Sequence, residues 1–282
     1  RFCSFCVVPY TRGSERSRPV RNILTEVHRL ASQGFQEITL LGQTVNSWQD
    51  PREQVITFTD LLRRIAEVEG IRRIRFTSPH PSEFHPDIVE VIETVPEVCN
   101  HIHLPLQSGA TTVLRRMRRD YTREEYLQKV ELLKQSRREI ALSADIIVGF
   151  PGETQAEFED TLSVMELVRY DSIFSFKYSP RPGTAAFAFP NMISDEEKSR
   201  RLQVLQQFQR KIQLEKHASL VGKEFEVLVD GRSQRDVEVL SGRTSQNKIV
   251  NFTGPSELSG QFVQVRVVGY SPNSLQGELV QC

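Results

Sequence analysis

Apolar side chains recur at the three- and four-residue spacing of an amphipathic helix in six segments: residues 20–33, 58–68, 87–93, 121–138, 154–169 and 195–214. Short β-branched and apolar runs, typical of buried strands, alternate with them at residues 37–41, 73–77, 101–106, 142–148 and 172–178. Thr154 stands three residues before Glu157, which predicts a capped helix start. The order gives five strand-then-helix units and predicts a parallel sheet, either open or closed into a barrel.

The residues that directly follow each predicted strand are the first candidates for a site. In a parallel α/β sheet, ligands bind at the carboxyl ends of the strands. These positions are occupied by Gly42, Gln43, Ser78, Pro79, His80, Gln107, Ser108, Gly149, Phe150, Ser179, Pro180 and Arg181. Many are glycines, prolines or small polar residues, which also serve in ordinary turns.

The pattern changes after residue 217. Short strand-like runs separated by polar turns replace the helical spacing, at residues 224–230, 235–240, 248–252, 262–270 and 276–280. Five short strands in so small a segment predict a barrel of the OB kind. We therefore expect two domains, residues 1–216 and residues 217–282.

The composition narrows the class of protein. Of 282 residues, 38% are hydrophobic and 26% are charged, a mixture too apolar for a disordered chain. No apolar run approaches the roughly 18 residues of a membrane-spanning helix, so we expect no membrane partner. Four scattered cysteines do not make a disulfide framework, which favours a reducing, cytoplasmic location. The chain begins without a methionine at Arg1, and we expect it to be cut from a longer protein.

Charge is balanced overall but unevenly distributed. The 36 Lys+Arg and 36 Asp+Glu give a net charge of zero, which excludes a uniformly basic nucleic-acid coat. The net charge is +4 in residues 1–30, +4 in residues 110–140 and +5 in residues 198–216. These segments either frame a barrel mouth for a polyanionic substrate or are ordinary solvated helix faces.

Cys3 and Cys6 form a C-x2-C pair. Two thiolates at this spacing can hold one metal ion or two iron corners of a cluster. A redox dithiol, half of a zinc site and two buried side chains are the alternatives on spacing alone. No second C-x2-C pair follows, so a four-ligand structural zinc site is unsupported. We predict ordinary loop or core positions for the histidines without an i,i+4 partner, namely His80, His85, His101 and His103.

The residues around this pair resemble the cluster-binding loop of radical S-adenosylmethionine (SAM) enzymes. That loop reads C-x3-C-x2-C with an aromatic residue before the last cysteine, a place that Phe5 takes in residues 1–13 (RFCSFCVVPYTRG). The first cysteine of the pattern would lie two residues before Arg1. Five further motifs resemble the methylthiotransferase family within this superfamily: residues 41–46 (LGQTVN), 76–80 (FTSPH), 103–109 (HLPLQSG), 145–153 (DIIVGFPGE) and 178–184 (YSPRPGT).

The resemblance implies a radical-SAM (β/α)6 TIM-like barrel that lacks its first strand. Cys3 and Cys6 would ligate a 4Fe-4S cluster whose third cysteine lies upstream, and SAM would chelate its open iron. The residues that would contact SAM are Phe5, Gly42, Gln43, Gln107, Ser108, Arg119, Asp145 and Gly149. Turns, loop packing and solvated charges are the ordinary alternatives for them. An auxiliary 4Fe-4S cluster would belong to a missing N-terminal domain, so we expect this chain alone to fail at sulfur insertion.

Residues 221–229 (VGKEFEVLV) and 240–252 (LSGRTSQNKIVNF) resemble the TRAM domain, an OB-like RNA-binding barrel. The second motif is similar to the methylthiotransferase branch that modifies tRNA. The implied RNA contacts are Arg243, Asn247, Lys248, Asn251 and Phe252. Phe252 would stack on a base, unless it points into the barrel core. Residues 217–282 carry a net charge of −1, so we expect the catalytic barrel to supply much of the RNA affinity.

Together the resemblances imply an enzyme that adds a methylthio group to carbon 2 of N6-isopentenyladenosine beside the tRNA anticodon. We expect a monomer whose partners are tRNA and an electron donor such as flavodoxin or ferredoxin. Two alternatives within the family take threonylcarbamoyladenosine in tRNA, or a ribosomal protein, as the target. The more distant alternative is a non-catalytic RNA-binding module with a zinc or relic C-x2-C pair.

Overall fold

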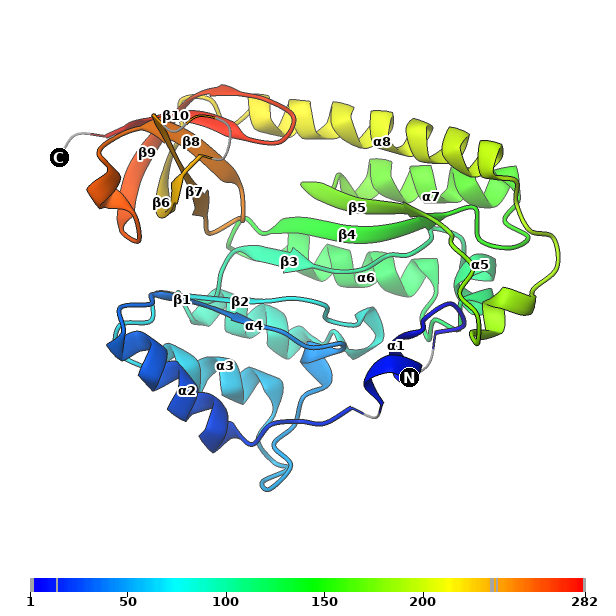
Figure 1. Cartoon of the computed structure of the whole chain (residues 1–282), viewed down its shortest axis with the longest axis horizontal. Coiled ribbons are helices and arrows are strands. Elements are labelled where there is room, and N and C mark those ends of the chain that lie inside the picture. The colour runs from blue at the N-terminus through cyan, green and yellow to red at the C-terminus, as the bar shows by residue number, and fades with distance from the viewer. Residues whose placement is uncertain (1–2, 14, 234–235, 237, 281–282) are drawn as a thin grey trace.

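The computed structural model describes residues 3–13, 15–233, 236 and 238–280. Its larger part is an arc of five parallel strands: β1 (Glu37–Leu40), β2 (Arg73–Phe76), β3 (His101–His103), β4 (Ala141–Val148) and β5 (Ser172–Lys177). Helices cover the outer face of the arc (Figure 1): α2 (Val20–Ser32), α3 (Phe58–Ala66), α4 (Pro86–Thr94), α6 (Arg123–Lys134), α7 (Gln155–Val168) and α8 (Asp195–Ala218). These strand-then-helix units confirm the predicted partial barrel.

The five strands form two hydrogen-bonded groups, β1-β2 and β3-β4-β5, rather than one continuous ladder. β2 meets the segment that precedes β3. The Ile74 N–H donates to the Glu97 carbonyl (2.7 Å), and the Ile74 carbonyl accepts from the Cys99 N–H (3.0 Å). Because these bonds fall before β3 begins, the arc continues across the gap without a ladder.

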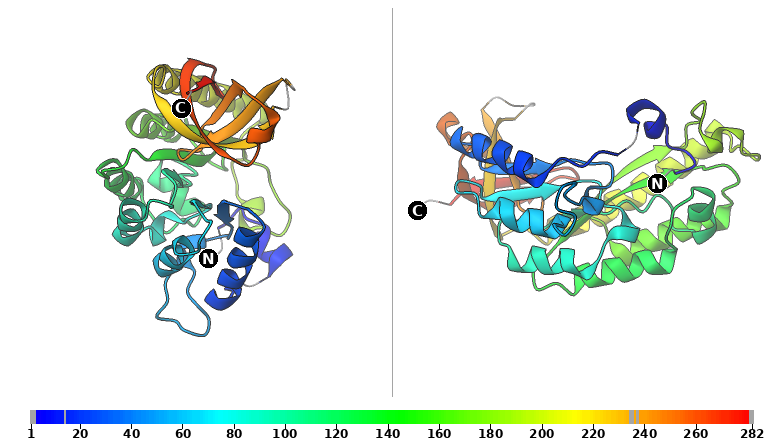
Figure 2. Two further views of the ribbon diagram at one scale, coloured as in Figure 1. Left: turned by 90° about the vertical axis from the view of Figure 1, so that its left-hand side faces the viewer. Right: turned by 90° about the horizontal axis from the view of Figure 1, so that it is seen from below.

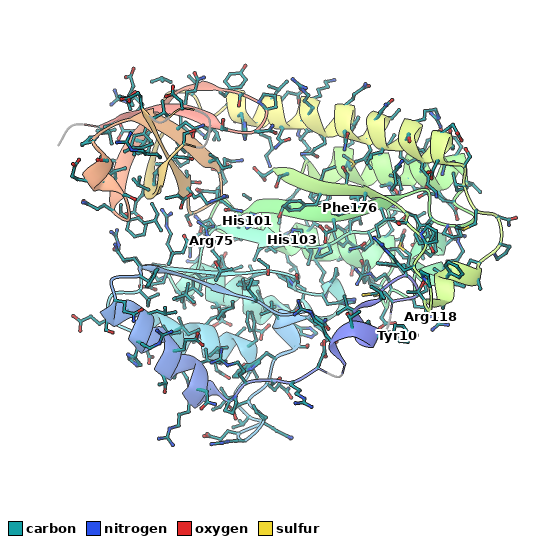
Figure 3. All side chains as sticks on the ribbon, viewed as in Figure 1. Tyr10, Arg75, His101, His103, Arg118 and Phe176 are labelled. Carbon is teal, nitrogen blue, oxygen red and sulfur yellow. The ribbon has the colours of Figure 1, made fainter. Side chains whose placement is uncertain are left out.

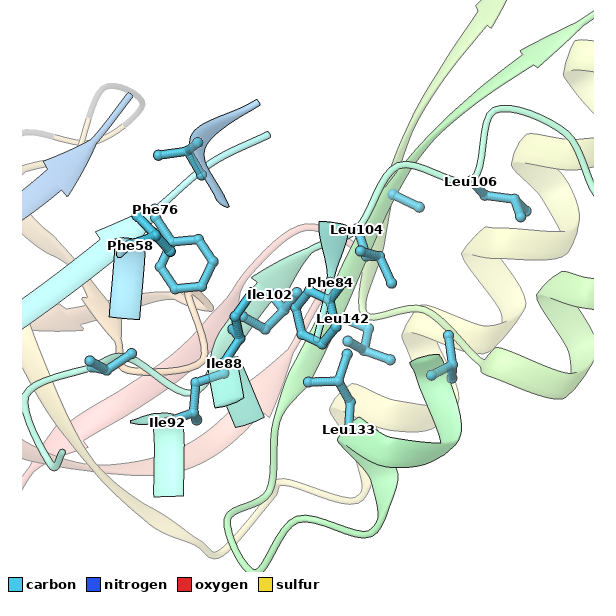
Figure 4. Close-up of a cluster of buried hydrophobic side chains, with 14 of the residues drawn as sticks. Phe58, Phe76, Phe84, Ile88, Ile92, Ile102, Leu104, Leu106, Leu133 and Leu142 are labelled. Atoms are coloured by element: carbon cyan, nitrogen blue, oxygen red, sulfur yellow. The ribbon is translucent and has the colours of Figure 1, made fainter. Parts of the chain in front are cut away.

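The main core lies between the strands and the helices. Figure 4 shows side chains of β2, β3 and β4 packed against those of α3, α4 and α6, among them Phe58, Phe76, Ile88, Ile92, Ile102, Leu133 and Leu142. Each of these side chains is at most 5% exposed. Burying one such side chain contributes about 1.5–3 kcal/mol, so this layer supplies much of the driving force for folding.

The predicted start of α7 is confirmed. The Thr154 Oγ1 accepts from the Glu157 N–H (3.2 Å), and the Glu157 carboxylate accepts from the Thr154 N–H (2.7 Å). This reciprocal pair satisfies two backbone donors that a helix leaves open at its first turn. No helix of the described residues is both long enough and apolar enough to cross a membrane.

Some elements differ from the prediction. Two short helices, α1 (Val8–Arg12) and α5 (Thr111–Arg116), were not predicted because five or six residues do not establish a helical period. The strand expected at residues 235–240 is β7 (Val239–Thr244), and Arg235 lies outside the described residues. Its polar end, residues 241–244 (SGRT), gives no apolar signal, and ladder bonds on both sides hold it in the barrel.

The C-terminal part is a closed five-stranded barrel, as predicted. Its strands are β6 (Glu224–Arg232), β7, β8 (Ile249–Thr253), β9 (Phe262–Tyr270) and β10 (Leu275–Leu279), in the order β10-β8-β7-β6-β9. A separate core fills it, with Val227, Val250, Val265 and Leu275 fully buried. Closure removes the open strand edges of so small a sheet.

This barrel is docked on the amino ends of the parallel strands, opposite the end where the chain begins (Figure 2). Arg73 and Arg75 of β2 donate to the carbonyls of Arg243 (2.7 Å) and Thr244 (2.8 Å). Buried Asp171, just before β5, pairs with Lys216 of α8 and with Lys248 of the barrel, both at 2.6 Å. Charged and backbone groups, rather than apolar side chains, therefore make much of this contact.

Candidate iron–sulfur and SAM site

Ser4 anchors the loop that carries the two cysteines. It is 2% exposed; its N–H donates to the Met117 carbonyl (3.0 Å) and its Oγ to the Arg116 carbonyl (2.8 Å). The Ser4 carbonyl accepts from the Ala186 N–H (2.8 Å). Since these partners come from the end of α5 and from the segment after β5, the loop is held at the carboxyl end of the arc.

Cys3 and Cys6 face one space. The Cys6 N–H donates to the Cys3 carbonyl (3.2 Å), which closes a tight turn, and both residues line a pocket of about 50 Å³ together with Tyr10 and Arg118. Cys6 also lines a neighbouring cleft of about 310 Å³. That cleft is bounded by the ends of β4 and β5, with Ile147, Phe176, Lys177 and Tyr178 in its wall.

The charge beside Cys3 favours an anionic occupant. Burial raises the pKa of the Cys3 thiol, and the nearby Arg119 guanidinium opposes that rise. The Arg119 Nε–H is buried and has no hydrogen-bond partner among the described residues. A buried, unpaired donor on a cation next to a thiol is costly unless an acceptor takes it.

These residues fit two ligands of an iron–sulfur cluster. Two thiols of one turn open on one pocket, next to a cation with a spare donor, and thiolates are the ligands that such clusters use. Within the described part of the chain, no group of three His, Cys, Asp or Glu is placed to hold a metal ion. A zinc site built from these residues alone would therefore lack its remaining ligands.

Several predicted SAM-contacting residues lie around the same end of the sheet. The Phe5 ring packs edge-on against Phe150 (6.3 Å), and Phe150 against Tyr178 (5.1 Å), so the loop is joined to the ends of β4 and β5. Gln107 adopts φ 65° after β3, and its backbone bonds Asp145 and Ile147 of β4. Ser108 is fully buried.

The remaining predicted SAM residues differ in placement. Gly149, at φ 71°, donates its N–H to the Glu153 carboxylate (2.6 Å) at the end of β4. Gly42 and Gln43 are exposed after β1 and line neither cysteine pocket. Asp145 also lies outside both pockets, on the inner face of the arc, where its Oδ2 is 3.4 Å from the His103 Nε2.

Two of the predicted RNA contacts are wrong. Phe252 is 2% exposed and belongs to the barrel core, so its ring cannot stack on a base; the alternative of a core position is confirmed. Lys248 is nearly buried against Asp171 and does not offer a free charge to a phosphate. The Phe252 prediction failed because its side chain points into the barrel's own core. The Lys248 prediction failed because a sequence motif does not say which part of the barrel surface is covered by another domain.

The other three residues predicted to contact RNA lie on the barrel surface or near it. Arg243 is partly exposed, and its guanidinium is 3.3 Å from Asp230 and bonded to the Asn247 Oδ1 (3.2 Å). Asn251 is half-buried in β8. That they contact RNA stays a prediction.

Sequence reasoning missed the aromatic lining of the inner face. Phe174 and Phe176 are 56% and 52% exposed although they belong to a strand of the central sheet. His103, expected to be an ordinary loop or core histidine, lies beside Phe174 with ring centroids 5.8 Å apart. The alternation of Phe174 and Phe176 in β5 was the available signal, but it reads equally as a strand with one buried face.

The model of the radical SAM superfamily matches residues 1–165, and that of the TRAM domain matches residues 218–280. Two curated relatives are both called tRNA-2-methylthio-N(6)-dimethylallyladenosine synthase. The protein of Koribacter versatilis (strain Ellin345) is 48% identical over 284 residues, and that of Geobacter metallireducens (strain ATCC 53774 / DSM 7210 / GS-15) is 49% identical over 278 residues. Both alignments cover 99% of this chain, which spans 64% and 63% of the relatives' lengths.

Two solved structures have the same fold at low sequence identity. Coproporphyrinogen III oxidase (HemN) from Escherichia coli gives a TM-score of 0.55 at 14% identity, covering 87% of this chain and 64% of that one. The radical SAM methyltransferase TsrM from Kitasatospora setae gives 0.53 at 18% identity, covering 66% and 36%. The family match extends over more than half of the chain and includes the cysteine loop at the carboxyl end of the arc. This chain belongs to the radical SAM superfamily.

Proposed function

We propose that this chain is part of a radical SAM enzyme that adds a methylthio group to carbon 2 of N6-isopentenyladenosine beside the tRNA anticodon. The observation that carries the proposal is the 48–49% identity, along nearly the whole chain, to relatives named for that product. The pocket lined by both cysteines supports it, because an RNA-binding module without a metal has no need of two thiols facing one space.

The chain's own residues would prepare the site for the chemistry. When bound, the cluster and SAM supply a carbon radical that removes hydrogen from an unreactive position. Cys3 and Cys6 would hold two cluster irons, and Ser4 fixes their turn. The spare Nε–H of Arg119 would bond the carboxylate of SAM, a charge-assisted contact. Phe5 and Phe150 would screen the cleft from water.

The RNA would approach the carboxyl end of the arc. Figure 3 shows Tyr10 and Arg118 at that end, where Tyr10 is 72% exposed and Arg118 lines the cysteine pocket. Arg181 lines the adjoining cleft. Cations attract the phosphate backbone, and exposed aromatic rings stack on unpaired bases. A tRNA substrate and free cysteines also favour a cytoplasmic location.

The cluster is tested by anaerobic reconstitution, with iron and sulfide, of the full-length protein that carries the third cysteine. We expect the wild type to bind iron with the broad visible absorbance of an iron–sulfur cluster, and Cys6→Ala to lose the share of iron and absorbance that belongs to this cluster. Cys99→Ala is the matched control. Cys99 is a buried free cysteine far from Cys3 and Cys6 in the sequence, so its substitution should leave the cluster unchanged. Equal iron content in all three proteins would contradict the assignment.

The target is tested by mass spectrometry of tRNA nucleosides from a strain that lacks the gene. We expect loss of the methylthio derivative of isopentenyladenosine and accumulation of isopentenyladenosine. Unchanged levels, with loss of a methylthio group from threonylcarbamoyladenosine or from a ribosomal protein instead, would refute the proposed target and identify the alternative.

A further inference from the structure

The inner face of β3, β4 and β5 carries a side-chain cluster that the cysteine site does not use. Alternate residues of β4, Ala144 and Ile146, point into the core under the helices, so Asp145 points to the opposite face. Asp145 pairs in register with Phe174 of β5. The His103 Nε2 is 3.4 Å from the Asp145 Oδ2, and its ring contacts Phe174. We call His103, Asp145 and Phe174 the inner-wall cluster.

The exposed Phe174 ring makes this inner wall a candidate surface for binding a ligand. Phe174 is 56% exposed, although it belongs to a sheet whose other face forms the main core. In the described part of the chain β5 pairs with β4 alone, so Phe174 lies on the edge strand and is reachable from the open side of the arc. Large aromatic side chains left exposed in a concave site are typical of recognition surfaces.

The polar half of the inner-wall cluster is oriented in advance. The Ser143 Oγ lies 2.9 Å from the His103 Nδ1 and 2.9 Å from the His101 Nε2 (Figure 3 labels both histidines). Desolvation lowers the pKa of His101 to about 3, so its ring is neutral and accepts or donates a single bond to Ser143. The two contacts of the Ser143 hydroxyl fix the orientation of the His103 ring and keep the His103 Nε2 next to Asp145.

The Asp145 carboxylate can accept further hydrogen bonds. Its side chain is 32% exposed, and among the described residues no backbone or side-chain group donates a hydrogen bond within normal range to it. A carboxylate beside an imidazole offers an acceptor and a ring nitrogen at one edge. An adenine presents the matching pair, the N6–H donor and the N7 acceptor, and keeps that N6–H when N6 carries one substituent.

We propose that the inner-wall cluster binds the target adenine of the RNA: Phe174 stacks on the ring, and Asp145 with His103 reads the N6–H and N7 edge. This proposal rests on the proposed function and names the residues that select its base. Guanine presents two acceptors at the same edge and would face the Asp145 carboxylate unfavourably. Gripping that edge leaves carbon 2, on the far side of the ring, free for reaction.

The position of the cluster relative to the cysteines agrees with this role. Asp145 precedes Ile147 by two residues, which is one step along the same face of β4, and Ile147 lines the cleft that contains Cys6. Phe176 is likewise one step beyond Phe174 and lines that cleft. The inner-wall cluster therefore lies directly below the cleft, and we assign Asp145 to the substrate rather than to SAM.

The test is the binding of fluorescent anticodon stem–loop RNAs to the protein, followed by anisotropy. The position beside the anticodon carries N6-isopentenyladenosine, guanosine or no base. We expect Phe174→Ala to weaken binding of the isopentenyladenosine RNA about tenfold, the loss typical of one aromatic stack, and to leave the abasic RNA unchanged. Asp145→Asn should reduce the preference over guanosine. Phe35→Ala, an equally exposed phenylalanine remote from the site, is the control.

The outcomes separate this inference from the proposed function. A wild type that binds none of the RNAs would overturn the RNA substrate itself. The inner-wall assignment would be overturned, and the RNA substrate would stand, if the wild type bound all three RNAs with equal affinity. The same conclusion would follow if Phe174→Ala lowered the affinity for the abasic RNA as much as for the other two. The inner-wall assignment also fails if Phe35→Ala has the effect expected of Phe174→Ala.

Discussion

Gly149, at the end of β4, is a position where the backbone and the packing both demand glycine. Its φ is 71°, and an added Cβ would collide with the Lys198 side chain of α8. Gly152 has nearly the same φ, 73°, but no atom within 4 Å of an added Cβ. These two glycines lie three residues apart in one loop. Comparing them therefore separates the effect of backbone strain from that of steric conflict.

We expect Gly149→Ala to lower the free energy of unfolding by about 3 kcal/mol, the sum of left-handed strain and overpacking. Gly152→Ala should lower it by about 1 kcal/mol, because only the strain applies. Urea unfolding of both variants measures the difference. Equal losses would mean that Lys198 moves aside without cost.

At the residue scale, the sequence singled out two cysteines that line one pocket in the structure, but few of the side chains around them. Only two residues separate Cys3 and Cys6, so their spacing made a shared ligand one of the possibilities, and the surrounding motif favoured it. Arg119 and Tyr178 reach the same region from elements far apart in sequence, and the inner-wall cluster joins three strands. Such proximity depends on register, which no single motif encodes.

Helix α7 shows how local chemistry positions one element of the site. The Glu157 carboxylate both caps the helix and binds the Arg116 guanidinium (3.0 Å) of α5. Although burial opposes ionisation, bonds from Arg116 and Thr112 bring the pKa of Glu157 to about 2. The cap therefore also fixes α5, whose end holds the cysteine loop through Ser4.

We expect Thr154→Ala to destabilise the protein by about 1 kcal/mol, the usual cost of a lost N-cap. Thr154→Ser keeps the hydroxyl acceptor and should lie within about 0.5 kcal/mol of the wild type. Thermal unfolding of the two variants provides the comparison. A serine variant as unstable as the alanine variant would show that the Thr154 methyl group, not the cap, matters.

At the element scale, periodicity predicted the strands and long helices because each of them buries an apolar face in one core, and that face repeats along the sequence. The strand predicted at residues 73–77 is β2 (Arg73–Phe76), and the helix at residues 20–33 is α2 (Val20–Ser32). The short helices and the polar end of β7 had no such face. Their conformation is determined by contacts with neighbouring segments, which a local pattern does not contain.

At the scale of the whole molecule, a buried carboxylate, Asp171, lies between the two parts and pairs with lysines of both. Burial raises the pKa of Asp171, but Lys248 and Lys216 outweigh burial and hold the pKa below its ordinary value of 3.8. The ionised form is therefore preferred by the folded state. Its stabilising contribution is fully present above the unfolded pKa and is lost as the pH falls through the folded pKa.

We expect Asp171→Asn to lower the free energy of unfolding by about 3 kcal/mol at neutral pH, because the substitution leaves two lysine charges unbalanced. The gap between variant and wild type should shrink as the pH falls below 3.8. Urea titrations at a series of pH values give both quantities. Asp160→Asn, in an exposed pair with Arg123, should change little at any pH.

The docking of the two parts could not be predicted from sequence. Arg73 and Arg75 occupy alternate positions of a strand, where apolar or solvent-facing residues are expected, yet both are less than 9% exposed. Their partners are carbonyls about 170 residues later, Arg243 and Thr244. Backbone acceptors are present in every residue and leave no trace in the composition.

Although the net charge is zero, the docking leaves the basic side chains at the two ends of the strands unequally paired among the described residues. At the amino ends of the strands, Arg73, Arg75 and Lys248 are already matched by carboxylates and carbonyls. At the other end, Arg118 and Arg181 border the cysteine pockets without an ion pair among the described residues. A polyanion diffusing nearby would be steered to arrive end-on, cysteine side first, and raised ionic strength should slow its capture more than its release.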